Sequence, residues 1–149
     1  MQNIIQPLTL EQEAKVRNRI AENPFISFME IEVSELGQGY AKFALPFRKS
    51  LANSIGLLQG GVIAAIADEA VAYALWSLVP DGEIINTVEY KINFLAPVRQ
   101  GPIEAQARII RRGKTISFGE VEVMNQGLLV AKGLFTYIHI KQHQDKHLI

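Results

Sequence analysis

The sequence predicts an α+β domain in which one long central helix lies against an antiparallel sheet of about six strands. An apolar, alanine-rich segment at residues 60–78 is long enough for a buried helix. Two short strand-like runs precede this segment, and four such runs, separated by tight-turn residues, follow it. With 149 residues, of which 48% are apolar, the chain is large enough to bury one core. No linker or internal repeat is visible, so we expect residues 1–149 to form a single domain.

The N-terminal segment, residues 1–24, is expected to be helical. Thr9 and Gln12 have the spacing of a capping box, which predicts a short helix over residues 10–22. Asn23-Pro24 should end it, because the residue before a proline avoids helical backbone angles. Two strands are then expected, over residues 28–35 and 40–46.

The long helix is predicted to follow a loop at residues 47–59 and to end before Pro80-Asp81-Gly82. The runs after it read as an antiparallel meander with tight turns between the strands. The predicted strands cover residues 84–95, 103–111, 115–124 and 128–140. Residues 141–149 are expected to form a flexible tail.

Composition excludes several classes of protein. Lys and Arg balance Asp and Glu at 15 each without a basic run, so nucleic acid is not an expected partner. The chain has no cysteine, which rules out disulfides, cysteine-bound zinc and a thiol nucleophile. Residues 57–79 could span a bilayer, but Asp68 near the middle would cost roughly 2.5–3.5 kcal/mol, so no membrane contact is expected. Residues 1–11 lack a secretory signal, and we expect a cytoplasmic protein.

Asp68 and Glu69 are the only charged residues between positions 50 and 80. Burying unpaired carboxylates is costly, which favours a functional role, although a paired structural carboxylate would explain either one alone. At 100° per residue, Asp68 lies about 80° and Glu69 about 180° around the helix from Gly60. We therefore expect Asp68 to be catalytic and Glu69 to be structural or at an interface.

The paired glycines at the start of the helix suggest how such a carboxylate would be used. The first backbone N–H groups of a helix can polarise a carbonyl oxygen, and Gly60 and Gly61 carry no side chain that would block it. Asp68 lies eight residues further on, about 12 Å along the axis, which is too far to serve the same carbonyl. Two copies packed antiparallel around Ala64 would solve this, which predicts a dimer with two composite sites. The alternative is that the glycines simply form a loop entering a helix.

A longer motif extends this pattern. Asn53, Gly56, Gly60, Gly61 and Asp68 have the spacing of Asn-x-x-Gly-x-x-His-Gly-Gly followed by an acidic residue. The sequence thus resembles the hotdog-fold acyl-CoA thioesterases, most closely the PaaI-like, phenylacetate-pathway branch. The resemblance covers about residues 28–140, including the strand at 87–97 and the turn at 111–115. It implies a hotdog fold, hydrolysis of an acyl- or aryl-CoA, and a homodimer that can pair into a dimer of dimers.

The resemblance also implies roles for individual residues. Asp68 would be the nucleophile or general base, and the Gly60 N–H would polarise the thioester carbonyl. Asn53 would position water or substrate, and Thr87 would orient the carboxylate or the water. The implied substrate and coenzyme A contacts are Gln59, Gly61, Arg111, Gly113, Lys114 and Thr115, with no cofactor besides the coenzyme A of the substrate. An ordinary hairpin with a solvated basic tip is the alternative for the turn.

Gln59 departs from the motif, which has histidine there. Glutamine cannot titrate near neutral pH, so a non-catalytic acyl-CoA-binding hotdog protein is the main alternative. A hotdog repressor and a hotdog hydratase are disfavoured by the short N-terminal segment and the lack of any histidine before His139. His139, His143 and His147 are spaced for metal binding on a helix. We favour a final strand and a polar tail instead, and expect no metal.

Overall fold

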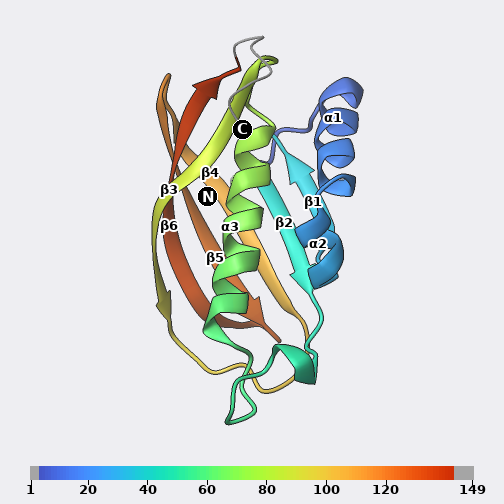
Figure 1. Cartoon of the computed structure of the whole chain (residues 1–149), viewed down its shortest axis with the longest axis vertical. Helices are drawn as coiled ribbons and strands as arrows, with labels where there is room; N and C mark the ends of the chain where they lie inside the picture. Colours follow the sequence, from blue (N-terminus) through green and yellow to red (C-terminus); the bar gives the residue numbers. More distant parts are fainter. Residues whose placement is uncertain (1–3, 143–149) are drawn as a thin grey trace.

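The computed structural model describes residues 4–142, which form one curved sheet around a long helix (Figure 1). All strand pairs are antiparallel, and their order across the sheet is β1-β2-β4-β5-β6-β3. The helices are α1 (Leu10–Ala21), α2 (Pro24–Met29) and α3 (Gly60–Trp76), with a 3-10 turn at Lys49–Leu51. The strands are β1 (Glu32–Gly37), β2 (Tyr40–Leu45), β3 (Glu83–Phe94), β4 (Ile103–Arg112), β5 (Ile116–Asn125) and β6 (Leu128–Lys141). The predicted sheet of about six strands around a long helix is confirmed.

The N-terminal segment contains two helices instead of the single one expected. The capping box forms, with Gln12 N donating to Thr9 Oγ1 at 3.2 Å and Thr9 N donating to Gln12 Oε1 at 2.9 Å. The first helix ends at Ala21 with Glu22 as its C-cap, and Asn23 caps a second helix, since its Oδ1 accepts from the backbone N–H groups of residues 25 and 26. Pro24 suits the first helical position, where no N–H is needed. The strand expected from residue 28 was therefore wrong at its start, and β1 begins at Glu32.

Helix α3 packs against the concave face of the sheet. Its predicted core face is buried, with exposed fractions of at most 4% for Ile63, Ile66, Ala70 and Tyr73. The other side of α3 is partly or fully exposed along Gly61, Ala65, Asp68 and Ala72. One sheet therefore covers one side of the helix and leaves a stripe of small residues open. No helix within residues 4–142 is long and apolar enough to cross a membrane.

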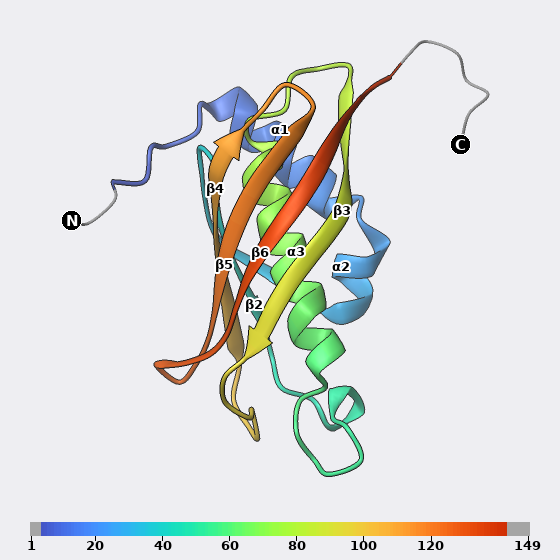
Figure 2. The same ribbon diagram turned by 90° about the vertical axis from the view of Figure 1, so that its left-hand side faces the viewer.

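The strand order corrects the predicted four-strand meander. Strands β4, β5 and β6 do form a meander, but β3 pairs with β6 at the edge of the sheet and not with β4. The chain leaves β3 through a loop containing Pro97. This loop passes the lower end of the sheet in Figure 2 and leads to the start of β4. This order aligns the Cα atoms of Thr87 and Tyr137, and a register shift follows between Thr87 and Glu89. Such a bulge redirects neighbouring side chains, and here it lies beside α3.

Most of the predicted tail lies outside the described residues, because the description ends at residue 142. Strand β6 itself extends to Lys141, one residue into that tail.

Candidate active site

The Asp68 carboxylate lies where α3, β3 and β6 meet. Thr87 Oγ1 donates from β3, at 3.0 Å from Oδ1 and 3.2 Å from Oδ2. The Tyr137 hydroxyl donates from β6, at 2.5 Å from Oδ1 and 2.9 Å from the backbone oxygen of Asp68. Two hydroxyl donors thus fix the carboxylate. Because Asp68 is only partly buried, the carboxylate still faces outward.

Tyr137 has no counterpart among the residues that the sequence pointed to. It is 1% exposed, and burial followed by the negative charge of Asp68 raises the pKa of its hydroxyl. The hydroxyl therefore stays protonated and remains a donor to the carboxylate. No local motif marks this tyrosine, because its contact with Asp68 depends on the packing of β6 against α3.

Glu69 points to a different side of α3. Its Oε2 accepts a hydrogen bond from Asn23 Nδ2 at 3.2 Å, and the same amide nitrogen donates to the Tyr73 hydroxyl at 3.1 Å. Burial, followed by the negative charge of Asp68, raises the pKa of Glu69 to about 7. Glu69 thus links α3 to the start of α2, and the two adjacent carboxylates have separate surroundings.

Gly60 and Asn53 line a second part of the candidate site. Both contact a cavity of about 310 Å³ that Phe94 and Leu95 also line. Asn53 Oδ1 accepts from Ile55 N at 3.1 Å and from Leu57 N at 3.0 Å, so this side chain shapes the loop before α3. Gln59 is the N-cap residue of α3 and is exposed. Within residues 4–142 no side chain caps the start of α3, which leaves this end of the helix dipole open toward the cavity.

The predicted site residues fall into three groups. Thr87 lies beside Asp68, whereas Asn53, Gln59 and Gly61 lie with Gly60 at the start of α3. The two groups are two turns of helix apart, about 12 Å. The third group, residues 111–115, forms the turn between β4 and β5, at the opposite end of the sheet from the loop that precedes α3 (Figure 2).

That turn presents Arg111, Lys114 and Thr115 to solvent. Gly113 is required by the turn itself, because a Cβ atom there would come 2.1 Å from the backbone oxygen of Ile116. The two exposed cations are suited to binding anions, while the backbone of the turn is tightly constrained.

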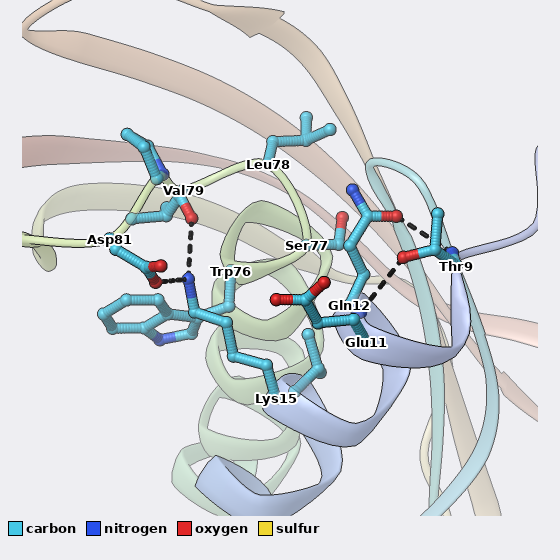
Figure 3. Close-up of a pocket in the computed structure, with 11 residues that line it drawn as sticks. Thr9, Glu11, Gln12, Lys15, Trp76, Ser77, Leu78, Val79 and Asp81 are labelled. Atoms are coloured by element: carbon cyan, nitrogen blue, oxygen red, sulfur yellow. Dashed lines mark hydrogen bonds and ion pairs between the residues drawn. The ribbon is translucent and has the colours of Figure 1, made fainter.

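A larger cavity, of about 540 Å³, lies between α1 and the C-terminal end of α3 (Figure 3). Figure 3 shows the Lys15 side chain pointing toward Asp81, and their Nζ and Oδ1 atoms are 2.5 Å apart. Thr9 and Gln12 bond to each other in the capping box. Because these polar groups already have partners and the cavity lies at the far end of α3 from Gly60, we do not assign it to the site.

Of the three regularly spaced histidines, only His139 lies among the described residues. His139 is buried in β6, and His143 and His147 lie outside the described residues. Within residues 4–142, no three His, Cys, Asp or Glu side chains are grouped so that they could hold a metal ion.

Comparison with known proteins gives a consistent set of relatives. A family model described as "Thioesterase superfamily" matches residues 55–132. The protein named "Putative esterase" from Saccharolobus solfataricus is 32% identical over 84% of this chain and 83% of its own length. A PaaI mutant structure from Thermus thermophilus has a TM-score of 0.72 and 26% identity, covering 78% of this chain and 98% of that one.

Two further solved structures cover nearly the whole chain. A Haemophilus influenzae thioesterase has a TM-score of 0.83 and 23% identity, covering 97% of this chain and 100% of that one. The PaaI protein of E. coli also has a TM-score of 0.83, with 22% identity over 91% of this chain and 97% of that one. These matches confirm the expected hotdog fold.

Proposed function

Because the chain belongs to the thioesterase superfamily, we propose that it hydrolyses the thioester of an acyl- or aryl-CoA to the free acid and coenzyme A. The observation that supports this most directly is the Asp68 carboxylate. It is held by the Thr87 and Tyr137 hydroxyls and faces outward beside the edge strand β3.

Asp68 supplies the attacking chemistry in this proposal. As a general base it takes a proton from water while the water oxygen adds to the thioester carbon. The C–S bond then breaks, and the proton passes from Asp68 to the departing sulfur, which releases coenzyme A as the thiol. As a nucleophile it would attack the thioester carbon and expel the thiolate of coenzyme A, which forms a mixed anhydride. Water then hydrolyses this anhydride to the free acid and restores the carboxylate. The Thr87 and Tyr137 hydroxyls fix the direction of the carboxylate in either case. Neither route requires a metal or a further cofactor.

The start of α3 supplies the complementary charge. The Gly60 N–H and the positive end of the helix dipole stabilise the oxyanion that forms at the thioester carbonyl. A side chain at position 60 would come 3.3 Å from the Phe94 ring and would narrow the cavity that the acyl group enters. Asn53 donates from the adjacent loop to water or to the substrate.

Two copies of the chain complete each site, because Gly60 and Asp68 of one copy are too far apart. Strand β3 lies at the sheet edge and exposes Val88, Tyr90 and Phe94 by 49–56%, as expected for a strand that a second copy covers. The open stripe of α3 supports the same arrangement, with one correction to the sequence prediction. Ala64 is already buried within the chain, with 7% exposed, so Ala65 is the small residue around which two helices would pack.

In this proposal the coenzyme A arm contacts the turn at residues 111–115, and the part of the substrate near the thioester contacts the start of α3. Arg111 and Lys114 are exposed and can bind phosphate groups, with Gly113 and Thr115 shaping the turn. Gln59 and Gly61 lie where they can donate to the substrate near the thioester.

The test is thiol release from a panel of short, long and aromatic acyl-CoA thioesters. Because the chain has no cysteine, a thiol reagent reports coenzyme A alone. We expect Asp68→Asn, which keeps the size and the hydrogen-bond acceptor, to lower kcat by roughly 10²–10⁴-fold. Glu69→Gln is the matched control and should change kcat by less than about threefold, because Glu69 bonds to Asn23 and not to the site.

Equal activity of the Asp68→Asn variant and the wild type would refute the assignment. Tight binding of acyl-CoA without thiol release by the wild type would instead support the non-catalytic binding protein that Gln59 favours.

A further inference from the structure

A buried polar network ties the β4–β5 turn to β6. The Ser117 Oγ atom lies 2.7 Å from His139 Nε2 and accepts a hydrogen bond from Gly113 N at 3.2 Å. The backbone N–H of His139 donates to the Thr115 oxygen at 2.7 Å. His139 therefore holds the turn twice, once through its backbone and once through Ser117. The turn and the end of β6 lie at the same end of the sheet in Figure 2.

Glu83 joins the network from the edge strand β3. Its Oε2 lies 3.4 Å from His139 Nδ1 and 3.1 Å from a terminal guanidinium nitrogen of Arg112. The side chain of His139 is 2% exposed, and within residues 4–142 its Nδ1 has no partner with hydrogen-bond geometry. The carboxylate thus balances the charge of Arg112 and faces the imidazole, and side chains from β3, β4, β5 and β6 meet at this point.

The order serine, histidine, carboxylate is that of a hydrolytic triad, but this serine cannot act as a nucleophile. Ser117 is 0% exposed, so no acyl group can reach its oxygen. One of its lone pairs is already used by the Gly113 N–H. The network therefore has a positioning role and not a catalytic one.

The contacts of this network indicate which atoms carry its protons. The charge of Glu83 favours the His139 tautomer with its proton on Nδ1, which leaves Nε2 to accept the Ser117 hydroxyl. Burial, and then the positive charge of Arg112, lowers the pKa of His139. The imidazole is thus neutral near pH 7, as this arrangement of donors requires.

We propose that His139 is a positioning residue that, through Ser117, holds the β4–β5 turn in the shape that binds the phosphates of coenzyme A. This inference rests on the proposed function, which assigns Arg111 and Lys114 of that turn to the coenzyme A arm. Loosening the turn weakens binding of the nucleotide part of the substrate. It leaves the Asp68 carboxylate unchanged, because Asp68 is held separately by Thr87 and Tyr137.

Two sets of variants test the role with matched controls. Ser117→Ala removes the hydroxyl, and Ser77→Ala removes another buried serine hydroxyl that accepts from a glycine N–H, that of Gly39, away from the turn. His139→Asn has no atom in place of Nε2, whereas the longer amide of His139→Gln can reach Ser117. Each variant is assayed with an acyl-CoA and with the N-acetylcysteamine thioester of the same acid, which lacks the phosphates.

The expected result separates KM from kcat. Loss of one or two hydrogen bonds in Ser117→Ala and His139→Asn should raise KM for the acyl-CoA roughly 3–10-fold, with kcat within about twofold. Both constants for the N-acetylcysteamine thioester should stay within about twofold, and Ser77→Ala and His139→Gln should resemble the wild type. An unchanged KM for the acyl-CoA in Ser117→Ala, or an equal loss with both thioesters, would overturn the proposal.

Amide hydrogen exchange without substrate provides a readout that is independent of activity. The Gly113 N–H should exchange several-fold faster in Ser117→Ala and at the wild-type rate in Ser77→Ala. The Gly113 N–H should also exchange several-fold faster in His139→Asn, and unchanged exchange in that variant would refute the role of His139, whatever the enzyme activity. An absence of acyl-CoA turnover by the wild type would refute the proposed function alone, and the exchange experiment would still decide whether His139 holds the turn.

Discussion

Replacing Tyr137 by phenylalanine isolates the hydroxyl that holds Asp68. The substitution removes one oxygen atom and leaves the ring in a position where the residue is 1% exposed. The carboxylate loses a donor at 2.5 Å but keeps the Thr87 hydroxyl at 3.0 Å from the same oxygen. The effect should therefore be a partial release of the carboxylate and not a loss of folding.

The size of the effect follows from this geometry. A hydrogen bond to a charged group contributes about 1.5–3 kcal/mol, and Asp68 is only partly buried, so we expect the free energy of unfolding to fall by about 1.5–2 kcal/mol. A carboxylate that is free to turn spends less time in the reactive orientation. We expect kcat to fall roughly 10-fold, which corresponds to about 1.4 kcal/mol.

Urea unfolding at pH 7 and thiol release from an acyl-CoA measure the two effects. Tyr40→Phe is the matched control, because the Tyr40 hydroxyl also donates to a carboxylate, Glu35, at 3.0 Å. Tyr40 lies on β2, which β4 and β5 separate from β6, so this variant should keep its kcat. The reasoning fails if Tyr137→Phe retains wild-type kcat and stability, or if both tyrosine variants lose kcat equally.

Three further predictions concern Glu69, Gly60 and β3. The pKa of Glu69 is raised from 4.5 to about 7, so its negative charge lowers the stability of the folded state only as pH rises above 4.5. Glu69→Gln should therefore raise the free energy of unfolding in urea by about 1 kcal/mol at pH 8, and leave it unchanged at pH 4. Gly60→Ala should lower kcat/KM about 10-fold, with partial recovery on adding Phe94→Leu, because the new methyl crowds that ring. Val88→Lys should give inactive monomers in analytical sedimentation, whereas Ile110→Lys, at a residue that is equally exposed on β4, should keep the dimer and its activity. The three predictions would be contradicted, in turn, by a Glu69→Gln effect that does not depend on pH, by a fully active Gly60→Ala variant, and by an active Val88→Lys monomer.

Local geometry explains why much of the fold was predictable. The capping box, the buried face of α3 and the angle between Asp68 and Glu69 depend on residues within a few turns of one helix, where the period fixes direction. The second helix was missed for an equally local reason. The strand predicted over residues 28–35 overlaps the end of this helix, because the cap from Asn23 and the fixed angles of Pro24 favour a helix from residue 24 to residue 29.

The partners of the site residues could not be predicted in the same way. Tyr137 is 69 residues from Asp68, and Ser117 is 22 residues from His139. Both contacts depend on β6 lying between β5 and β3, an order that strand patterns do not specify because β3 and β4 are adjacent in sequence. The choice of Ala65 instead of Ala64 on the open side of α3 likewise depends on which flank the sheet covers.

The sequence by itself determined a long apolar helix with two carboxylates on different sides and paired glycines at its start, because helical geometry links residues that are close in the chain. Only the tertiary structure decided which groups hold those carboxylates and how the charged turn is anchored. The Asp68 contacts bring β3 and β6 to α3, the Glu69 contact brings the start of α2 to α3, and the Ser117–His139 contact joins β5 to β6. They exist only once the helices and strands have assembled in their final order.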